Sequence, residues 1–378
     1  MKSFASPFLR SVGTMIGSIV GVGVFGIPFA FAQSGPALGA LILLGLAALL
    51  TLMQLMYAEV ALHTQGTHRL AGYVRAYLGT QWGQFAAIAL AFGLWGSMVA
   101  YMIVGGSFLH AIFSSSMGGS SFWYALLLAG LACAFIYRGI QFIAKLEIVI
   151  VSVLLFLFAF IMFDALPHVS FANLAGVDWK LALLPYGVSL FALGGMGVIP
   201  EMKAVLGQKY EHHLPRAVIT AMTAITVLYL LFGLIVVAAL GPHTTEMAFD
   251  GLVLVLGDTF RVVAALLGSI TVLSIFTLVG IELTNTLRYD VHLSKKLAVS
   301  LSVGIPVLLY TFGVRELVDV LSFVGSVFGG VLGIIVVCMY EKMRERLPNR
   351  KHICLNIPKA VRYGIAAVFA SGIFLSLF

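Results

Sequence analysis

Two hydrophobic segments of this 378-residue chain are interrupted by glycine and proline in the same way. Residues 21–28 read GVGVFGIP and residues 194–201 read GGMGVIPE, with the two prolines 172 positions apart. Both residue types weaken a helix, because glycine loses much entropy on ordering and proline has no N–H. Main-chain N–H and C=O groups freed at such breaks can bind the carboxylate and the ammonium group of a zwitterion.

The first break offers donors for an anionic group. Unwinding frees the amides of Gly21, Val22 and Gly23, and a new helix starting near Phe25 points its positive N-terminal end at the same place. Helix N-termini bind anions in this way, each contributing ~0.3–2 kcal/mol. We therefore expect a carboxylate to bind there. Close helix packing is the alternative explanation for these glycines, because residues 13–21 also carry a repeated GxxxG spacing.

The second break offers acceptors for a cationic group. The carbonyls of Phe191, Ala192 and Gly194 lose their helical partners there and can accept hydrogen bonds from an ammonium group. Gly195 belongs to the same break, and Met196 is expected to shape the pocket for a ligand side chain. No charged side chain is needed at the membrane midplane, where an unpaired ion costs at least ~2.5 kcal/mol.

The composition indicates that membrane helices hold these breaks. Hydrophobic residues make up 61% and charged residues 10% of the chain, and the mean hydropathy is +1.07, which excludes a soluble globular domain. Each spanning helix needs ~20 apolar residues. The chain predicts eleven spans, at 11–34, 36–62, 84–113, 120–138, 142–163, 182–204, 216–240, 259–287, 297–313, 317–341 and 360–378.

The distribution of basic residues predicts the orientation. With the N-terminus in the cytoplasm, only Lys180, Arg261 and Arg315 of the 22 lysines and arginines fall on the external side. This asymmetry satisfies the positive-inside rule. The protein is therefore expected in the cytoplasmic membrane with an external C-terminus, and the net charge of +7 does not require a nucleic-acid partner.

The two breaks fall in spans one and six, which run in opposite directions. We therefore predict an all-α membrane protein with one transporter domain over residues 1–378. It comprises a first inverted repeat over 11–163, a second over 182–341 and an additional helix over 360–378. Such repeats place two discontinuous helices opposite each other near the midplane, where substrate binds.

Residues 13–28, GTMIGSIVGVGVFGIP, resemble the amino acid/polyamine/organocation permeases. Residues 191–201 resemble the signature of their sixth span, with an acidic residue after the break. The nearest branch by resemblance is that of the amino acid/auxin and aromatic amino acid permeases. The resemblance implies the fold of the leucine transporter, with five-plus-five inverted repeats around a central site.

This resemblance also implies which side chains line the site. In that fold the third span faces the two breaks, so Trp95 and Tyr101 are expected to cover the substrate. Phe25 and Met196 are expected to shape the pocket for its side chain. Aromatic residues in spans also serve as simple packing, and this alternative stays open.

The coupling ion is expected to be either H⁺ or Na⁺, with no other metal and no cofactor. By resemblance, a sodium site would use carbonyls of Gly17 and Val20 and hydroxyls of Thr271 and Ser274. Sodium-coupled relatives carry two adjacent hydroxyl residues in span eight, and here Ile275 follows Ser274. One expected ligand is therefore missing.

Proton coupling needs a group that titrates inside the membrane. Glu201, directly after the second break, is expected to act as a gate residue. The charged candidates are all expected in the cytoplasmic third of the membrane, where they also suit a salt-bridge network at an inner gate. They are Glu59, Lys145, Glu147, Glu201 and Glu282.

The sequence thus predicts a secondary active amino acid importer, a symporter that works by alternating access. It is not predicted to be an enzyme, because the chain has no DDxxD, HExxH or GxSxG motif. A non-transporting amino acid sensor and a carrier of another small organic solute, such as a polyamine, remain the alternatives. The sequence does not indicate which amino acid binds, the direction of net flux or the oligomeric state.

Overall fold

A computed structural model describes residues 5–66, 68–138, 141–346 and 357–377, with only the main chain described for 5, 6, 141–150 and 377. The described chain is helical throughout. Its main helices are α1 (Ala5–Ile19), α2 (Gly23–Ser34), α3 (Pro36–His63), α4 (Leu70–Leu78), α5 (Thr80–Met117), α6 (Ser121–Arg138), α7 (Gln141–Ala165), α8 (Leu184–Ala192), α9 (Ile199–Tyr210), α10 (Leu214–Leu240), α11 (Ala248–Tyr289), α12 (Lys295–Thr311), α13 (Leu317–Phe323), α14 (Gly330–Arg346) and α15 (Lys359–Leu377).

Shorter helical segments connect several of these. They are the 3₁₀ turns η1 (Leu166–His168), η2 (Phe171–Leu174), η3 (Trp179–Leu181), η4 (Met196–Val198), η5 (Glu211–His213) and η6 (Gly241–His243), and the π-helix η7 (Val324–Gly329). The π-helix lies between α13 and α14 without a break in the chain. Such π segments are rare and occur often at functional sites.

Long apolar helices dominate the described residues. Eight helices are long and apolar enough to cross a membrane, and nine are if α1 and α2 count as one bent span. Backbone polar groups must be satisfied internally in lipid, which is why helices are used. The chain is therefore a multi-pass membrane protein.

The first span bends sharply at residues 20–22. The axes of α1 and α2 meet at 61° across this short gap. Val20 still donates to Ile16 O at 2.8 Å, and Phe25 donates to Val22 O at 3.1 Å, so one helix ends and another begins within a few residues. Pro28 lies inside α2 without ending it, since the break precedes it.

The second interruption lies between α8 and α9. α8 ends at Ala192 with Leu193 as its C-cap, and Gly195 takes the backbone angles φ −169° and ψ 40°. η4 follows, and Pro200 occupies the first turn of α9, where its missing N–H costs no hydrogen bond. The chain therefore enters a 3₁₀ turn directly after Gly195 and resumes an α-helix at Ile199.

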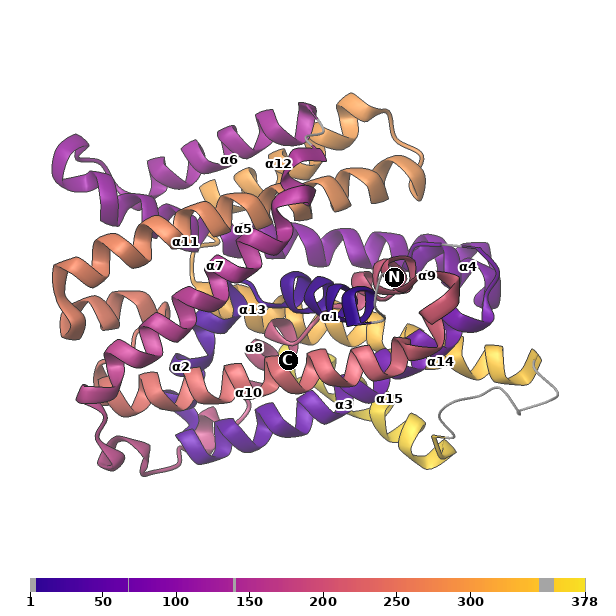
Figure 1. Cartoon of the computed structure of the whole chain (residues 1–378), viewed down its shortest axis with the longest axis horizontal. Coiled ribbons are helices and arrows are strands. Elements are labelled where there is room, and N and C mark those ends of the chain that lie inside the picture. The colour runs from indigo at the N-terminus through magenta and orange to yellow at the C-terminus, as the bar shows by residue number, and fades with distance from the viewer. Residues whose placement is uncertain (1–4, 67, 139–140, 347–356, 378) are drawn as a thin grey trace.

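The interrupted helices lie in the middle of the molecule. Figure 1 shows α1, α8 and α13 between one edge formed by α6 and α12 and the opposite edge formed by α3 and α10. Among the largest contacts are those of α2 with α8 and of α1 with α9. The two interrupted spans therefore pack directly against each other.

An aromatic cluster fills the space beside α2. The Phe25 ring lies 5.7 Å from both Phe108 and Phe158 and 6.3 Å from Phe232, and Phe108 lies 4.9 Å from Phe249, all between ring centroids. All five side chains are at most 3% exposed. The packed rings leave the side chains beside α2 almost without solvent exposure.

Candidate substrate site between the two helix breaks

A cavity of about 200 Å³ lies between the two interrupted spans. Its walls come from the end of α1, the middle of α5, the second break, α11 and the π-helix. Its lining residues are Ser18, Ile19, Leu90, Gly93, Leu94, Ser97, Tyr101, Leu190, Phe191, Gly194, Gly195, Met196, Gly197, Val198, Glu201, Val279, Glu282, Val324, Gly325, Phe328, Gly329 and Leu332. We call this space the central cavity.

The second break supplies much of the wall, as Gly194, Gly195 and Met196 line the cavity together with Phe191. Gly194 N donates to Phe191 O at 3.0 Å, and Val198 N to Gly195 O at 3.4 Å, so some of the local carbonyls remain engaged. Ala192, also predicted to bind substrate, does not line this space. Its Cα instead lies 2.9 Å from the position that a Cβ on Gly23 would take.

The first break lies beside Tyr101. A Cβ on Gly21 would lie 2.7 Å from the Tyr101 hydroxyl, so this glycine lets the ring approach the main chain. Tyr101 lines the central cavity and is 7% exposed, and its hydroxyl has no hydrogen-bond partner among the described residues. A hydroxyl on the wall of a cavity can bond to water or to a ligand there.

A residue from the second half of the chain supports the first break. The buried Tyr229 hydroxyl on α10 donates to the carbonyl oxygen of Ile19 at 3.1 Å. Ile19 is the last residue of α1, so its carbonyl has no partner within the helix. Tyr229 therefore satisfies one of the main-chain groups that the break frees.

Two aromatic residues predicted at the site lie elsewhere. Trp95 donates from Nε1 to Leu301 O on α12 at 3.0 Å, and it lines a separate crevice beside α12 and α13. Phe25 packs in the aromatic cluster and does not line the central cavity. Each of these side chains is held by other partners in this structure, and their contact with substrate stays a prediction.

The residues predicted to hold sodium are only partly brought together. Thr271 lines a space of about 10 Å³ beside Gly21 and Val22, at the first break. Its hydroxyl donates to Leu267 O, and that of Ser274 donates to Ile270 O, so both bond back to their own helix. Ser274 does not line that space. The carbonyls of Gly17 and Val20 stay a prediction.

Two carboxylates face the central cavity. Glu201 lies on the first turn of α9 and Glu282 on α11, and both line the cavity. A Cβ on Gly197 would lie 2.6 Å from Glu282 Oε1, so the carboxylate touches the main chain after the second break. Glu59 instead lies 3.7 Å from His63 on α3. The side chains of Lys145 and Glu147 lie outside the described residues.

Polar contacts tie the helices together near the end of α9. Lys203 on α9 donates to the carbonyl of Ala61 on α3 at 2.6 Å and lies 3.8 Å from Glu211. Arg69 lies 3.9 Å from Asp290, just after α11. Burial raises the pKa of Asp290, and the positive charge of Arg69 acts in the opposite direction. These contacts involve residues other than Glu201, whose role as a gate stays a prediction.

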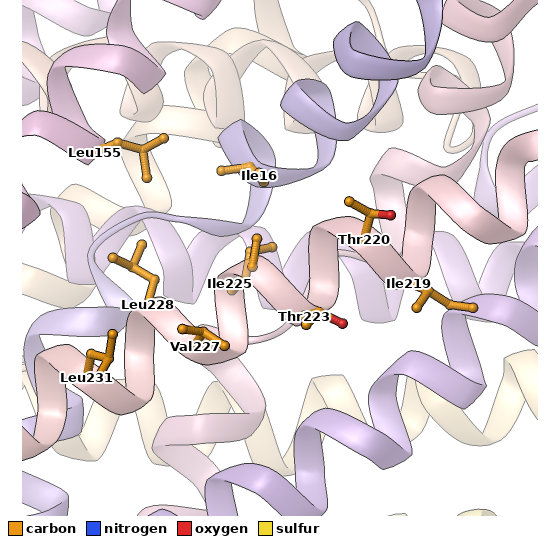
Figure 2. A pocket seen from close by; sticks show the side chains of 10 residues that line it. Ile16, Leu155, Ile219, Thr220, Thr223, Ile225, Val227, Leu228 and Leu231 are labelled. Carbon is orange, nitrogen blue, oxygen red and sulfur yellow. The ribbon is translucent and has the colours of Figure 1, made fainter. Parts of the chain in front are cut away.

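A second crevice among the described residues is of a different kind. It has a volume of about 740 Å³, and Figure 2 shows its lining side chains on α10, with Ile16 and Leu155 facing them from α1 and α7. Apart from Thr220 and Thr223, the labelled side chains are aliphatic. Its lining offers two hydroxyl groups and no charged side chain, so the central cavity is the better candidate site for a zwitterion.

Sequence reasoning missed several residues of the central cavity. Ser18, Ser97 and Phe328 line it, and Gln54 lies directly behind Gly195. A glutamine in the middle of an apolar span is a signal the sequence does contain, because polar residues there are expensive and often functional. The positions of the others depend on helix rotation.

Comparison with known proteins identifies the family. A family model described as the tryptophan/tyrosine permease family matches residues 5–378. The chain belongs to this family. The match covers both helix breaks and every predicted site residue, so the central cavity lies within the region that defines these permeases.

Curated relatives of this family member include transport proteins from bacteria and a plant. The "Tyrosine-specific transport system 1" of Haemophilus influenzae is 28% identical over 52% of this chain and 50% of the relative. The "Tyrosine permease" of Enterobacter agglomerans is 27% identical over 61% and 58%. "Amino acid transporter ANT1" of Arabidopsis thaliana is 24% identical over 63% and 58%. The alignments thus span between half and 58% of these relatives' lengths.

Solved structures of transporters share the fold of this permease. It matches a crystal structure of MhsT in complex with L-phenylalanine with a TM-score of 0.69 and 16% identity, over 98% of both chains. It matches Mhp1, a nucleobase-cation-symport-1 family transporter, with a TM-score of 0.67 and 12% identity, over 99% of this chain and 91% of that one. At these identities the likeness concerns the fold alone.

Proposed function

We propose that this permease is a secondary active importer of aromatic amino acids, which binds its substrate in the central cavity. The observation that carries the proposal is the position of this cavity, between two glycine-broken spans and beside the unpartnered Tyr101 hydroxyl. The family name and the printed names of the relatives support aromatic substrates. The Phe191 and Phe328 rings in the wall suit an aromatic side chain.

Substrate recognition would use the main chain at both breaks. The N-terminal turn of α2, with Gly21, Val22 and Gly23, would donate to the carboxylate, and Tyr101 would add a hydroxyl donor. Carbonyls of the second break would accept from the ammonium group. Both charged ends of the amino acid are then paired, as a buried site in a membrane requires.

The architecture we propose is a five-plus-five inverted repeat with eleven crossings. The first repeat would run over 11–163 and the second over 182–341, with α15 as an additional crossing and the N-terminus in the cytoplasm. The exposed lining residues Ser18, Glu201 and Glu282 would then face the cytoplasmic side, and the aromatic cluster around Phe25 would close the external side. The structure would represent an inward-facing state of an alternating-access cycle.

Transport would be coupled to H⁺ or Na⁺. The two carboxylates in the central cavity support proton coupling, because proton binding to either one removes their mutual repulsion. Thr271 at the first break supports sodium coupling. Glu282→Gln is expected to abolish proton-driven accumulation while retaining substrate exchange, whereas Thr271→Val is expected to change only a sodium response.

Uptake into proteoliposomes tests the proposal. Radiolabelled tyrosine, tryptophan, phenylalanine and leucine would be offered under an imposed pH gradient or an imposed sodium gradient, each applied separately. We expect concentrative uptake of at least one aromatic amino acid under one gradient, and weaker uptake of leucine. Binding of an aromatic amino acid without any uptake or exchange would instead indicate a sensor and contradict the proposal.

A polyamine carrier is the second candidate, and one observation favours it. Glu201 and Glu282 give the central cavity two negative charges, which would suit a polycation. Competition separates the two classes, since excess spermidine should not inhibit uptake of an aromatic amino acid by a dedicated amino acid carrier. Spermidine uptake that exceeds amino acid uptake would favour the second candidate.

A further inference from the structure

A buried glutamine beside the second break has no partner. Gln54 on α3 is fully buried, and neither its amide nitrogen nor its carbonyl oxygen makes a hydrogen bond with any described residue. Its Nε2 atom lies 3.8 Å from the position that a Cβ on Gly195 would occupy. The carboxamide is therefore next to the extended glycine of the second break.

The first break also has a buried polar side chain beside it, and that side chain is hydrogen-bonded to the break. Tyr229 on α10 is also fully buried and donates its hydroxyl to the freed carbonyl of Ile19. α3 follows the first interrupted span, and α10 follows the second. Each break thus has a buried polar side chain from the helix that follows the other break, and of these two side chains only Tyr229 is hydrogen-bonded.

The Gln54 carboxamide would find partners if the second break took up another conformation. A carboxamide with two donors and two acceptor sites is costly to bury without partners in a membrane protein. The cost is recovered if another conformation supplies them. The main chain at Gly195 lies beside Gln54, and its N–H and C=O groups change position if the second break moves.

We propose that Gln54 and Tyr229 are paired positioning residues that stabilise opposite conformations of the transporter. Tyr229 holds the first break in the conformation seen here, while Gln54 is released. In the alternative conformation Gln54 forms hydrogen bonds with the main chain of the second break, and the hydrogen bond from Tyr229 to Ile19 is broken. The proposal rests on the proposed alternating-access function, but it concerns the conformational equilibrium and not the identity of the substrate.

The two residues therefore have opposite effects when their polar groups are removed. Tyr229→Phe destabilises the conformation seen here, and Gln54→Leu destabilises the alternative one. A hydrogen bond of this type changes an equilibrium by about threefold to tenfold. The variant Gln54→Met keeps a flexible side chain of similar length and checks the result if Gln54→Leu folds poorly.

Each variant has a matched control one helical turn away. Thr51 on α3 donates to Ala47 O at 2.6 Å, and Thr226 on α10 donates to Met222 O at 2.6 Å, so both bond within their own helices. Thr51→Val and Thr226→Val remove a hydroxyl without affecting either break. Neither control should move the equilibrium.

The test measures access to the central cavity with a cysteine reporter. Ser18, an exposed lining residue, is replaced by cysteine after Cys133, Cys338 and Cys354 are changed to serine. The labelling rate with a membrane-impermeant thiol reagent is then measured in inside-out vesicles, in which the predicted cytoplasmic side faces the reagent. We expect Gln54→Leu and Gln54→Met to raise this rate and Tyr229→Phe to lower it, each by about threefold to tenfold.

The outcomes separate this inference from the proposed function. Shifts in the same direction, or no shift with either glutamine variant, would overturn the pairing even if amino acid uptake is demonstrated. Opposite shifts would support it even if the substrate turns out to belong to another class. The reporter itself needs no substrate, so the two hypotheses fail independently.

Discussion

At the scale of single residues, the site depends on close approach between glycines and large neighbours. Gly21 admits the Tyr101 ring, and Gly23 admits the main chain of Ala192. Neither contact uses a charged side chain, which agrees with the high cost of unpaired charge in a membrane. Binding is therefore expected to be most sensitive to added methyl groups and to the loss of single hydroxyl groups.

The Tyr101 hydroxyl provides the first prediction. Tyr101→Phe removes a donor that we place on the substrate carboxylate, a bond of about 1.5–3 kcal/mol with a charged partner. The KM for uptake should rise about tenfold or more, with little change in folded protein. The exposed Tyr363 on α15 provides the control, since Tyr363→Phe should leave KM unchanged. An unaltered KM in Tyr101→Phe would remove this residue from the site.

Gly23 provides the second prediction. A Cβ at this position would lie 2.9 Å from the Ala192 Cα, which cannot move aside as a flexible side chain can. Overpacking of this kind costs about 1–3 kcal/mol, so Gly23→Ala should lower uptake about tenfold or more by separating α2 from α8. Gly45→Ala on α3 meets nothing within 4 Å and should transport normally. Equal uptake by the two variants would argue against a functional contact at Gly23.

At the scale of elements, helix positions followed from the sequence much better than helix rotations. Apolar runs bounded by glycine, proline and charged residues predicted stretches close to α3, α6 and α10. The faces were not predictable, because these helices are apolar all round. Trp95 and Tyr101 are six residues apart, which places them about 120° apart around a helix, so they point in different directions. Only the packed structure shows that Tyr101, and not Trp95, lines the central cavity.

The hydrogen bond of Trp95 provides the third prediction. Trp95→Phe removes the hydrogen bond to Leu301 that joins α5 to α12, at a cost of about 0.5–1.5 kcal/mol. The melting temperature of the purified protein should fall while the KM for uptake stays the same. A raised KM with unchanged melting temperature would restore Trp95 to the substrate site.

The loop before α11 provides the fourth prediction. Burial, followed by the negative charge of Glu316, raises the pKa of Glu246. A carboxyl group whose pKa is higher in the folded than in the unfolded protein contributes stability when the pH is below its pKa in the unfolded protein. This contribution is lost as the pH rises through its pKa in the folded protein. Glu246→Gln should therefore be more stable than the wild type at about pH 7 and similar to it at about pH 4. Thermal melting of both proteins at the two pH values measures this. A stability difference that does not depend on pH would contradict the raised pKa of Glu246.

At the scale of the whole molecule, the end of α1 and the second break line one central cavity, although they are far apart in the sequence, and Gly21 and Val22 of the first break line a small separate space. The cavity contains groups that the sequence pattern pointed to, such as Gly195 and Met196, and groups that it could not point to, such as Phe328. The latter depend on how α5 and the π-helix turn toward the second break. The family match supports the class of transporter. Under the proposed function, main-chain groups of the breaks pair both ends of a zwitterion, and Glu201 and Glu282 add two carboxylates to the cavity wall.

Buried polar groups show the same dependence on tertiary structure. Gln54 and Tyr229 stand out in the sequence only as polar residues in apolar spans, and nothing there shows that each lies beside a break. In the structure an unsatisfied carboxamide costs about 1–3 kcal/mol, which is a large part of a protein's stability. The proposed pairing with Tyr229 would recover this cost in the alternative conformation, in which Gln54 bonds the second break.

The most direct test of this account is a cryo-EM structure of the protein with the aromatic amino acid that it transports at a saturating concentration. The account predicts density for the ligand in the central cavity, with its carboxylate near Gly21 to Gly23 and Tyr101, and its ammonium group near the carbonyls of the second break. Ligand density confined to another crevice, such as that shown in Figure 2, would contradict it, as would an occupied cavity whose ligand contacts neither break.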